Sequence, residues 1–407
     1  MKLCVKGGYL IDPVNNIEDY GTVWIEDDII VCVKTEHATF GEIPSWANSS
    51  EQNIGTIDTS GKWIVSGFVD LHVHFRDPGF EYKEDIITGC NAALKGGFTK
   101  VCCMPNTKPV TDCEKVVSYI KDKAKSVKGV EVLVVGAVTK GQAGNELADI
   151  EEMVNAGICA ISEDGKTVMN AGLMREGMIK AKELGVPFFS HADDETLVGM
   201  AIGEELIVAR DILLAKETGC KLHICHISTK DSVEMVRRAK ADGIDVTAEV
   251  APHHFVFDKS RVNNDGNKKM NPPLRSAEDV KAMLAGLADG TIDAIATDHA
   301  PHAREEKEIE YEKALNGVIG LETSFAVSYT SLVKTGVLSP MQLIDAMSKK
   351  PCEILGIKPP SISVGELADF NIIDIEEKYE ISVSDLASKS VNSPFIGMSV
   401  YGRISKI

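Results

Sequence analysis

The spacing of hydrophobic and polar positions along this chain changes near residue 60. Before that point, short apolar runs alternate with turn residues and predict strands at Lys2 to Val5, Thr22 to Ile25 and Ile29 to Val33. The polar and small residues from Glu42 to Gly55 predict a loop that leads into the next unit. The chain therefore begins with a small β unit.

From Trp63 onward, short β-rich apolar runs alternate with longer stretches of helical periodicity. Eight runs are predicted as strands: Ile64–Leu71, Lys100–Met104, Glu131–Val135, Ile158–Ile161, Pro187–Ser190, Leu222–Cys225, Asp245–Val250 and Asp293–Ala296. Helices are predicted between them at Ile86–Lys95, Cys113–Ser126, Ala148–Ala156, Leu173–Leu184, Gly203–Thr218, Ser232–Asp242 and Ala277–Leu287. This alternation is typical of βα units around parallel strands. Eight units over a span near the typical ~250 residues predict an α/β fold, the (β/α)8 TIM-like barrel. The alternative is an open doubly wound sheet, which usually has a glycine-rich phosphate loop after its first strand, and none follows here.

The pattern after the barrel predicts two further helices and two strands. The helices are expected at Ser339–Met347 and near Glu353, and the strands at Phe370–Ile373 and Ser399–Ile404. The C-terminal strands and the N-terminal β unit are each too small to bury a core alone, so we expect them to combine. We predict a small β-sandwich domain from residues 1–60 and 360–407, and a barrel domain from residues 61–359.

Composition narrows the class of protein. The chain has 407 residues, 44% of them hydrophobic, and a formal net charge of −18, which disfavours nucleic acid and anionic membranes as partners. Its N-terminus lacks the features of a secretory signal, and its apolar runs are shorter than the ~20 residues of a spanning helix. The ten cysteines include no Cys-x-x-Cys pair, which disfavours a disulfide framework and a thiolate zinc site. We expect a soluble cytoplasmic protein.

The most informative local motif is Asp70-Leu71-His72-Val73-His74-Phe75-Arg76. Side chains at alternate positions of a strand share one face, so His72, His74 and Arg76 are expected to point into one cavity. A lone His-x-His pair is weak evidence for a metal site. Other residues must complete it.

Candidate ligands follow several of the predicted strands. They are His72 and His74 after the first strand, Glu163 and Asp164 after the fourth, His191 after the fifth, His226 after the sixth and Asp298 after the eighth. Because the carboxyl ends of barrel strands meet at one face, these residues are expected to lie together. Imidazole and carboxylate groups suit Zn²⁺ and similar divalent ions. Four histidines and two carboxylates, with Glu163 and Asp164 competing for one place, exceed the needs of one tetrahedral ion. We therefore favour two ions that share a carboxylate and serve a hydrolysis.

Several single residues also fit a structural role. Taken alone, His191 or His226 fits a buried structural or supporting histidine better than a ligand, and their joint placement after separate strands favours ligands. Glu163 has the opposite strand parity to Asp164 and would make a poor bridge. Cys225 next to His226 would face the other way on a strand, which disfavours a nucleophilic cysteine. The remaining histidines are interpreted as structural (His37, His223), supporting (His253, His254) or packing residues (His299).

Taken together, these motifs resemble the class I dihydroorotases of the amidohydrolase superfamily over essentially the whole chain. The segments that carry the resemblance are Asp70–Gly79, Met104–Thr107, Ser162–Gly165, Ser190-His191, Cys225–Thr229, Asn271–Arg275 and Thr297–His302.

The resemblance implies a set of metal ligands. His72, His74 and Asp298 would hold a first zinc ion, and His191 and His226 a second where it is present. Many relatives have a carboxylated lysine as the bridging ligand. In this chain no lysine immediately follows the fourth strand, and Asp164 is expected to take that place.

The resemblance also implies a substrate site and a reaction. Arg76 and His302 are expected to contact the substrate carboxylate, Asn106 and Asn271 to bind the substrate, and backbone groups at Asn316 and Gly317 to touch its ring. Arginine suits bidentate carboxylate recognition, and asparagine matches a ring amide. The expected activity is the reversible zinc-dependent cyclisation of N-carbamoyl-L-aspartate to dihydroorotate in pyrimidine biosynthesis, with Asp298 moving the proton.

Two alternatives stay open at this point. One is a related cyclic amidase that acts on dihydropyrimidines, hydantoins or allantoin. The other is a non-catalytic homologue that serves as a partner of aspartate transcarbamoylase. The resemblance also leaves open a homodimer and, for the active enzyme, association with aspartate transcarbamoylase.

Overall fold

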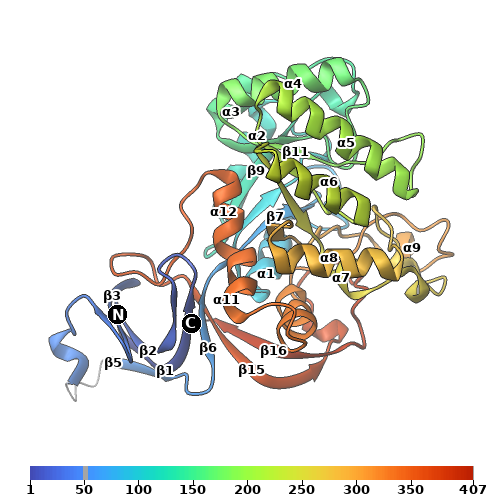
Figure 1. Cartoon of the computed structure of the whole chain (residues 1–407). Coiled ribbons are helices and arrows are strands. Elements are labelled where there is room, and N and C mark those ends of the chain that lie inside the picture. The colour runs from blue at the N-terminus through green and yellow to red at the C-terminus, as the bar shows by residue number, and fades with distance from the viewer. Residues whose placement is uncertain (49–53, 407) are drawn as a thin grey trace.

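The computed structural model describes residues 1–48 and 54–406, and its larger unit is a parallel barrel surrounded by helices (Figure 1). The barrel strands follow chain order: β7 (Phe68–Val73), β8 (Phe98–Cys103), β9 (Glu131–Ala137), β10 (Ile158–Ser162), β11 (Phe188–Ser190), β12 (Leu222–Ile224), β13 (Val246–Val250) and β14 (Ala294–Ile295). A parallel bridge between Val73 and His299 joins the first strand to the segment after the last. The predicted (β/α)8 barrel is confirmed.

Helices cover the outside of the barrel in the order that the periodicity predicts. They are α1 (Ile86–Lys95), α2 (Glu114–Ala124), α3 (Ile150–Ala156), α4 (Ala171–Leu184), α5 (Ala201–Thr218), α6 (Lys230–Ala241) and α8 (Ala277–Asp289). Local sequence fixes several of their ends. Asp85 caps α1 in a capping box with Thr88, and Ser276 caps α8 in one with Asp279. Their apolar faces pack on the strands and form the largest hydrophobic core of the molecule.

The smaller unit is a mixed sheet built from both ends of the chain, and both termini lie in it (Figure 1). Its strands are β1 (Lys2–Asp12), β2 (Ile17–Glu26), β3 (Ile29–Thr35), β4 (Thr39–Phe40), β5 (Ile54–Asp58), β6 (Trp63–Ser66), β15 (Phe370–Glu380) and β16 (Ser399–Lys406). The sheet has its own core, which includes Leu10, Val23 and Phe370. This sheet fits the predicted small β-sandwich domain and confirms that the C-terminal strands combine with the N-terminal unit. The exact domain boundaries at residues 60 and 360 stay a prediction.

One predicted strand is wrong. The run Ile64–Leu71 forms two strands in different sheets, since β6 pairs with β1 and β15 whereas β7 pairs with β8. The change occurs at Gly67, where a Cβ would lie 2.5 Å from a side-chain atom of Thr99. Both strands are buried, so hydrophobicity alone does not reveal where the chain leaves one sheet for the other.

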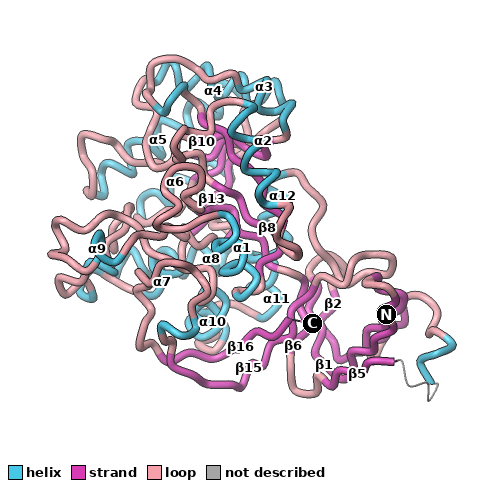
Figure 2. Tube along the Cα trace, turned by 180° about the vertical axis from the view of Figure 1, so that it is seen from behind, coloured by secondary structure: helices cyan, strands magenta, loops and turns pink. Residues whose placement is uncertain are grey.

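Two further stretches differ from the prediction. Within the predicted loop Glu42–Gly55, the chain forms a 3₁₀ turn (Ser45–Asn48) and β5 begins at Ile54; residues 49–53 lie outside the described residues. The helices predicted at Ser339–Met347 and near Glu353 are both present, as α11 (Pro340–Ile344) and α12 (Lys350–Leu355), but a π-helical segment (Asp345–Lys349) joins them into one continuous run. In Figure 2 these helices lie where the barrel meets the mixed sheet.

The remaining helical segments are short and were not predicted. They are η2 (Lys140–Gln142), α7 (Pro252–Val256), η3 (Lys259–Arg261), η4 (Gly266–Lys268), α9 (Arg304–Lys307), α10 (Ser324–Ser328), the π-helical η5 (Tyr329–Val333) and η7 (Val383–Asp385). None of the helices in the described part of the chain combines the length and apolar character needed to cross a membrane.

Candidate active site

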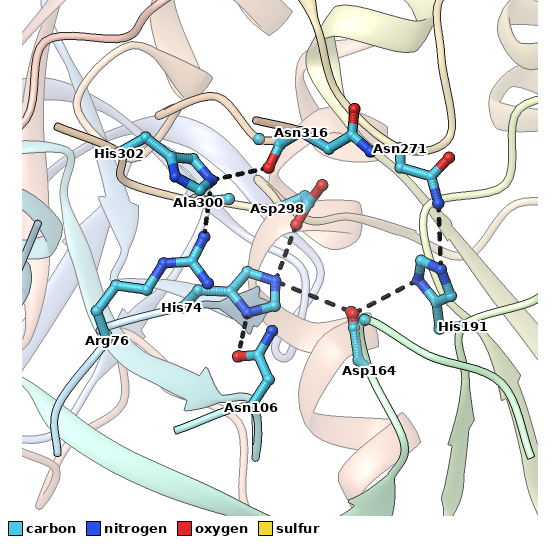
Figure 3. A pocket seen from close by; sticks show the side chains of 12 residues that line it. His74, Arg76, Asn106, Asp164, His191, Asn271, Asp298, Ala300, His302 and Asn316 are labelled. Carbon is cyan, nitrogen blue, oxygen red and sulfur yellow. Dashed lines mark hydrogen bonds and ion pairs between the residues drawn. The ribbon is translucent and has the colours of Figure 1, made fainter. Parts of the chain in front are cut away.

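The polar residues that follow the barrel strands line one cavity of about 200 Å³ (Figure 3). Its wall consists of His74, Arg76, Asn106, Asp164, Gly165, His191, Asn271, Asp298, Ala300, His302, Asn316 and Gly317. These residues come from segments that are far apart in sequence and meet because the strands of the barrel are parallel.

The first group of candidate ligands consists of His72, His74 and Asp298, which lie close to one another and to Asp164. His74 Nε2 lies 3.1 Å from Asp298 Oδ1, and His72 Nε2 lies 3.7 Å from the same oxygen. His72 Nε2 is also 3.1 Å from Asp164 Oδ1. All four side chains are buried, and His72, His74 and Asp298 offer ligand atoms close enough to surround one metal ion.

The second pair of histidines faces the same aspartate. His191 Nδ1 lies 3.0 Å from His226 Nε2. Asp164 reaches His191 Nδ1 at 3.5 Å through Oδ2 and His226 Nε2 at 4.0 Å through Oδ1. Figure 3 shows Asp164 between His74 and His191. Asp164 therefore contacts both halves of the histidine cluster, as a bridging carboxylate must.

The protonation chemistry of His72 tests whether these residues suit a cation. Nδ1 of His72 lies 2.9 Å from Glu249 Oε1, which can only accept a hydrogen bond. A neutral His72 ring would therefore carry its proton on Nδ1 and a lone pair on Nε2. That lone pair would face the carboxylates of Asp164 and Asp298. The cluster therefore needs a positive charge, either a proton on His72 or a metal ion. The donor set of imidazoles and carboxylates fits a divalent metal.

The electrostatics of the carboxylates agree with this view. Burial would raise the pKa of Asp164, but His72 and His191 outweigh it and hold that pKa well below its usual range. Asp298 behaves in the same way, because its hydrogen bond with His74 and the charge of His72 lower its pKa against burial. Both side chains are thus kept ionised, the form in which carboxylates bind metals.

The backbone aims several of these side chains through left-handed conformations. Arg76, His226 and Asp298 have φ values of 62°, 32° and 49°. Non-glycine residues rarely adopt this region, and where they do so at a functional site the surroundings hold them in it. The expectation that Arg76 shares a strand face with His72 is wrong, since β7 ends at Val73. Arg76 reaches the cavity through a turn, and its Nε donates to Pro301 O at 3.1 Å.

Every predicted substrate-binding residue lines the cavity. Arg76 Nη2 lies 3.4 Å from His302 Nε2, and His302 Nε2 lies 2.8 Å from Asn316 O. Asn106 contacts His74 Nδ1 through Oδ1 at 2.9 Å, and the Asn271 amide donates to Asp193 at 3.0 Å. The cavity therefore has a cationic wall at Arg76, opposite the Asn271 wall (Figure 3).

The residues interpreted as non-ligands also have defined contacts. Glu163 accepts from the backbone N–H groups of Val138 and Thr139, so it faces away from the cavity. His223 Nε2 contacts Glu249 Oε2 at 3.1 Å. His254 Nε2 lies 2.9 Å from the carbonyl of Pro272, next to Asn271. Cys225 is buried, and burial raises the pKa of its thiol, which argues against a nucleophile.

Sequence reasoning missed several residues that support the site. Glu249 holds His72 and His223, Gln142 donates to the backbone carbonyls of Glu163 and Asp164, and Lys83 and Glu306 contact His302. Glu249 had a visible signal, because a charged residue inside an apolar strand is unusual in a buried sheet. Gln142, Lys83 and Glu306 come from connecting segments, and local sequence carries no signal for their contacts.

Comparison with known proteins gives a consistent result. The family described as Dihydro-orotase-like matches residues 61–206. A dihydroorotase from Trichlorobacter lovleyi is 44% identical over 421 aligned residues, which cover 99% of this chain and 96% of the relative. A dihydroorotase from Pelotomaculum thermopropionicum is 46% identical over 422 aligned residues, with the same two coverages of 99% and 96%.

Solved structures show the same architecture in related enzymes. An L-hydantoinase (dihydropyrimidinase) from Arthrobacter aurescens superimposes with a TM-score of 0.86 at 26% identity, covering 98% of this chain and 93% of that protein. A D-hydantoinase (dihydropyrimidinase) from a Thermus species gives a TM-score of 0.85 at 26% identity, with coverages of 99% and 93%. The sequence identity to the two dihydroorotases, 44% and 46% over nearly the full length, is well above the 26% identity to either hydantoinase. The chain belongs to the dihydroorotase family.

Proposed function

We propose that this protein is a dihydroorotase that interconverts N-carbamoyl-L-aspartate and (S)-dihydroorotate plus water, in the biosynthesis of pyrimidines. The observation that carries the proposal is the joint presence, in one cavity, of a converging histidine and carboxylate cluster and a partly buried arginine. A cyclic amide that carries a carboxylate needs both features, because the arginine pairs with the carboxylate while the cluster serves the ring amide.

We assign the cofactor as zinc, with one or two ions per subunit. His72, His74 and Asp298 would hold the first ion, His191 and His226 the second, and Asp164 would bridge them. Such ions lower the pKa of water and polarise an amide carbonyl. The ligand atoms already converge without an ion, and the carboxylates are held ionised, so the chain is preorganised for this cofactor.

The protein's own residues then have distinct tasks. Arg76 and His302 bind the substrate carboxylate, and Asn106 and Asn271 bind the substrate amide groups, with backbone contacts from Asn316 and Gly317. Asp298 contacts His74 through Oδ1, and we assign proton transfer to this carboxylate. It takes the proton from the attacking water and passes it to the ring nitrogen as the C–N bond breaks. In the direction of ring closure the same proton moves in reverse.

The alternative functions are less well supported. The hydantoinase fold neighbours make a related cyclic amidase the second candidate, but Arg76 gives the cavity a cation that an uncharged ring does not need. A non-catalytic homologue would be expected to lose metal ligands, and all six are present. Three further properties stay predictions: a homodimer, association with aspartate transcarbamoylase, and a cytoplasmic location. Size-exclusion chromatography of the protein alone tests the homodimer, and the same measurement with aspartate transcarbamoylase added tests the association.

Metal content measured together with activity tests the proposal. The purified enzyme is expected to contain zinc and to hydrolyse dihydroorotate in preference to dihydrouracil and allantoin. Turnover of only the last two compounds would refute the substrate assignment. Asp164→Ala is expected to lower both zinc stoichiometry and turnover, since it removes the contact to both histidine pairs. Full activity of that variant would refute the bridging assignment.

A further inference from the structure

Lys83 is a buried cation directly behind His302, on the side away from the cavity. Only 8% of its surface is exposed. Its Nζ lies 3.2 Å from His302 Nδ1 and 3.0 Å from Glu306 Oε1. A buried lysine is rare unless it is paired, and here one of the polar partners is a neutral ring that lines the substrate cavity.

The neighbours of the His302 ring define its tautomer. Nδ1 has a donor, Lys83 Nζ, at 3.2 Å and an acceptor, Glu306 Oε2, at 3.3 Å. Nε2 has an acceptor, Asn316 O, at 2.8 Å and a donor, Arg76 Nη2, at 3.4 Å. A neutral ring carries one proton, so only one donor and one acceptor can be matched in full.

The shorter contact on each nitrogen selects the same state. A proton on Nε2 matches the 2.8 Å contact to Asn316 O, and the lone pair on Nδ1 then accepts from Lys83. The opposite tautomer would bring a lone pair on Nε2 within 2.8 Å of a carbonyl oxygen, which is repulsive. A doubly protonated ring is disfavoured too, because burial and the charges of Arg76 and Lys83 lower the pKa of His302 to about 3.

We propose that Lys83 is a positioning residue that fixes His302 in the tautomer with its proton on Nε2, so that the ring presents an N–H donor to an anionic group in the cavity. The role in substrate selection rests on the proposed dihydroorotase function, whereas the tautomer itself does not. A carboxylate oxygen that replaces Asn316 O as the acceptor would then receive the His302 N–H beside the Arg76 guanidinium.

The surroundings of Lys83 are built to hold the ammonium group in place. Glu306 balances its charge and also accepts from the Tyr82 hydroxyl at 2.9 Å. Burial would raise the pKa of Glu306, but Lys83 and the other donors lower it to about 2, so the carboxylate stays ionised. On the backbone, Ser390 donates to the carbonyl of Lys83 at 2.7 Å. Contacts of both its side chain and its main chain therefore hold the lysine in place beside the ring.

Nitrogen-15 NMR of the histidine rings tests the tautomer without any reference to activity. The enzyme labelled with ¹⁵N-histidine should show a neutral His302 with its proton on Nε2, assigned from the signal that His302→Asn removes. Lys83→Met should shift this signal toward the other tautomer or a mixture, and Lys83→Arg, which keeps a donor, should restore it. A proton on Nδ1 in the parent enzyme, or a spectrum that Lys83→Met leaves unchanged, would overturn the proposal.

A double-mutant cycle tests the consequence for the substrate. Lys83→Met should raise the KM for dihydroorotate about tenfold with little change in kcat, the size expected for a hydrogen bond to a charged group. In a His302→Asn background the same change should alter KM less than about twofold, because Lys83 acts through the ring. Equal effects in both backgrounds would refute the proposal.

Lys389 offers a matched control, which tests whether Lys83→Met acts only by loosening the segment around residues 81–85. Its ammonium group binds Glu81 O and Asp85 Oδ2 in the same segment as Lys83, but at the exposed side. Lys389→Met should leave the NMR signal and KM unchanged, and a KM increase equal to that of Lys83→Met would refute a specific role of Lys83. Absence of dihydroorotate turnover in the parent enzyme would contradict the proposed function, while the tautomer measurement would still decide on Lys83.

Discussion

Replacing Glu249 with glutamine should weaken zinc binding while leaving the barrel folded. Glu249 lies on β13, where its two carboxylate oxygens contact His72 Nδ1 at 2.9 Å and His223 Nε2 at 3.1 Å. All three side chains are fully buried. The hydrogen bonds of the two rings lower the pKa of Glu249 to about 2 against the effect of burial, so the group is an anion at neutral pH.

The size of the effect follows from how a glutamine amide can fit between two rings. If its oxygen stays on His72, His223 can adopt the other tautomer, since its Nδ1 can donate to Thr247 Oγ1 at 2.9 Å. Only the negative charge is then lost, and zinc affinity should fall about tenfold. If the amide NH₂ faces His72 instead, the ring proton moves to Nε2, the atom that points at the metal position. The loss should then approach about 100-fold, or roughly 2.7 kcal/mol.

Competition with a chromophoric chelator at neutral pH gives the zinc affinity of both proteins, and circular dichroism confirms that the variant is folded. Asp245→Asn is the matched control. It removes the same charge immediately before β13, about 13 Å along the strand from Glu249, and should leave the affinity unchanged. An affinity of Glu249→Gln within twofold of the parent would show that Glu249 does not orient His72, and would refute the reasoning.

Three other outcomes are expected. Arg76→Met should raise the KM for dihydroorotate by roughly 10 to 150-fold, the range for a lost charged hydrogen bond, and an unchanged KM would place the carboxylate elsewhere. Gly317→Ala should raise KM and lower the melting temperature, because its φ is 133° and the added Cβ would lie 2.8 Å from Ala300 Cβ and 3.0 Å from His302 Nε2. Gly61→Ala is the control, because Gly61 has a φ of 78° and open space around the added Cβ. It should lower the melting temperature through backbone strain but leave KM unchanged. His302 should make the fold more sensitive to acid: burial, Arg76 and Lys83 lower its pKa to about 3. The unfolded chain therefore binds a proton below about pH 6.5 that the folded protein does not, and stability falls as the pH drops through this range. Between pH 7 and 5, the melting temperature of His302→Asn should therefore fall less than that of the parent protein. The difference should correspond to up to about 2 kcal/mol of unfolding free energy, and an equal fall in both proteins would contradict the assignment.

Much of the site was accessible from strand positions alone. His72, Asp164, His191, His226 and Asp298 each follow a predicted strand, and parallel strands of a barrel bring their carboxyl ends to one face whatever the side-chain details. Small errors in strand boundaries therefore did not matter. The preference for Asp164 over Glu163 was also correct, although both residues lie beyond the end of β10, so strand parity is not its cause. Glu163 faces away because it accepts hydrogen bonds from the backbone N–H groups of Val138 and Thr139.

Other features depended on contacts that the sequence does not encode locally. The split of the run Ile64–Leu71 between two sheets depends on which strands lie beside β6 and β7, and both strands are equally apolar. The direction of Arg76 depends on a left-handed backbone that its surroundings impose. Lys83 meets His302 across 219 positions of sequence, and Glu249 meets His72 across 177.

The sequence by itself therefore determined the order of strands and helices, the barrel and the identity of the groups at its mouth. Periodicity and strand-end position are local properties of the sequence. The parallel barrel then brings the residues at the strand ends together in one cluster. The tertiary structure alone decided how the groups act. It set which oxygen of Asp164 faces which histidine, which nitrogen of His72 and of His302 carries the proton, and which buried charges stand behind them. Those properties depend on atoms from distant segments that meet within hydrogen-bonding distance inside a buried site, where an unmatched donor or charge is costly.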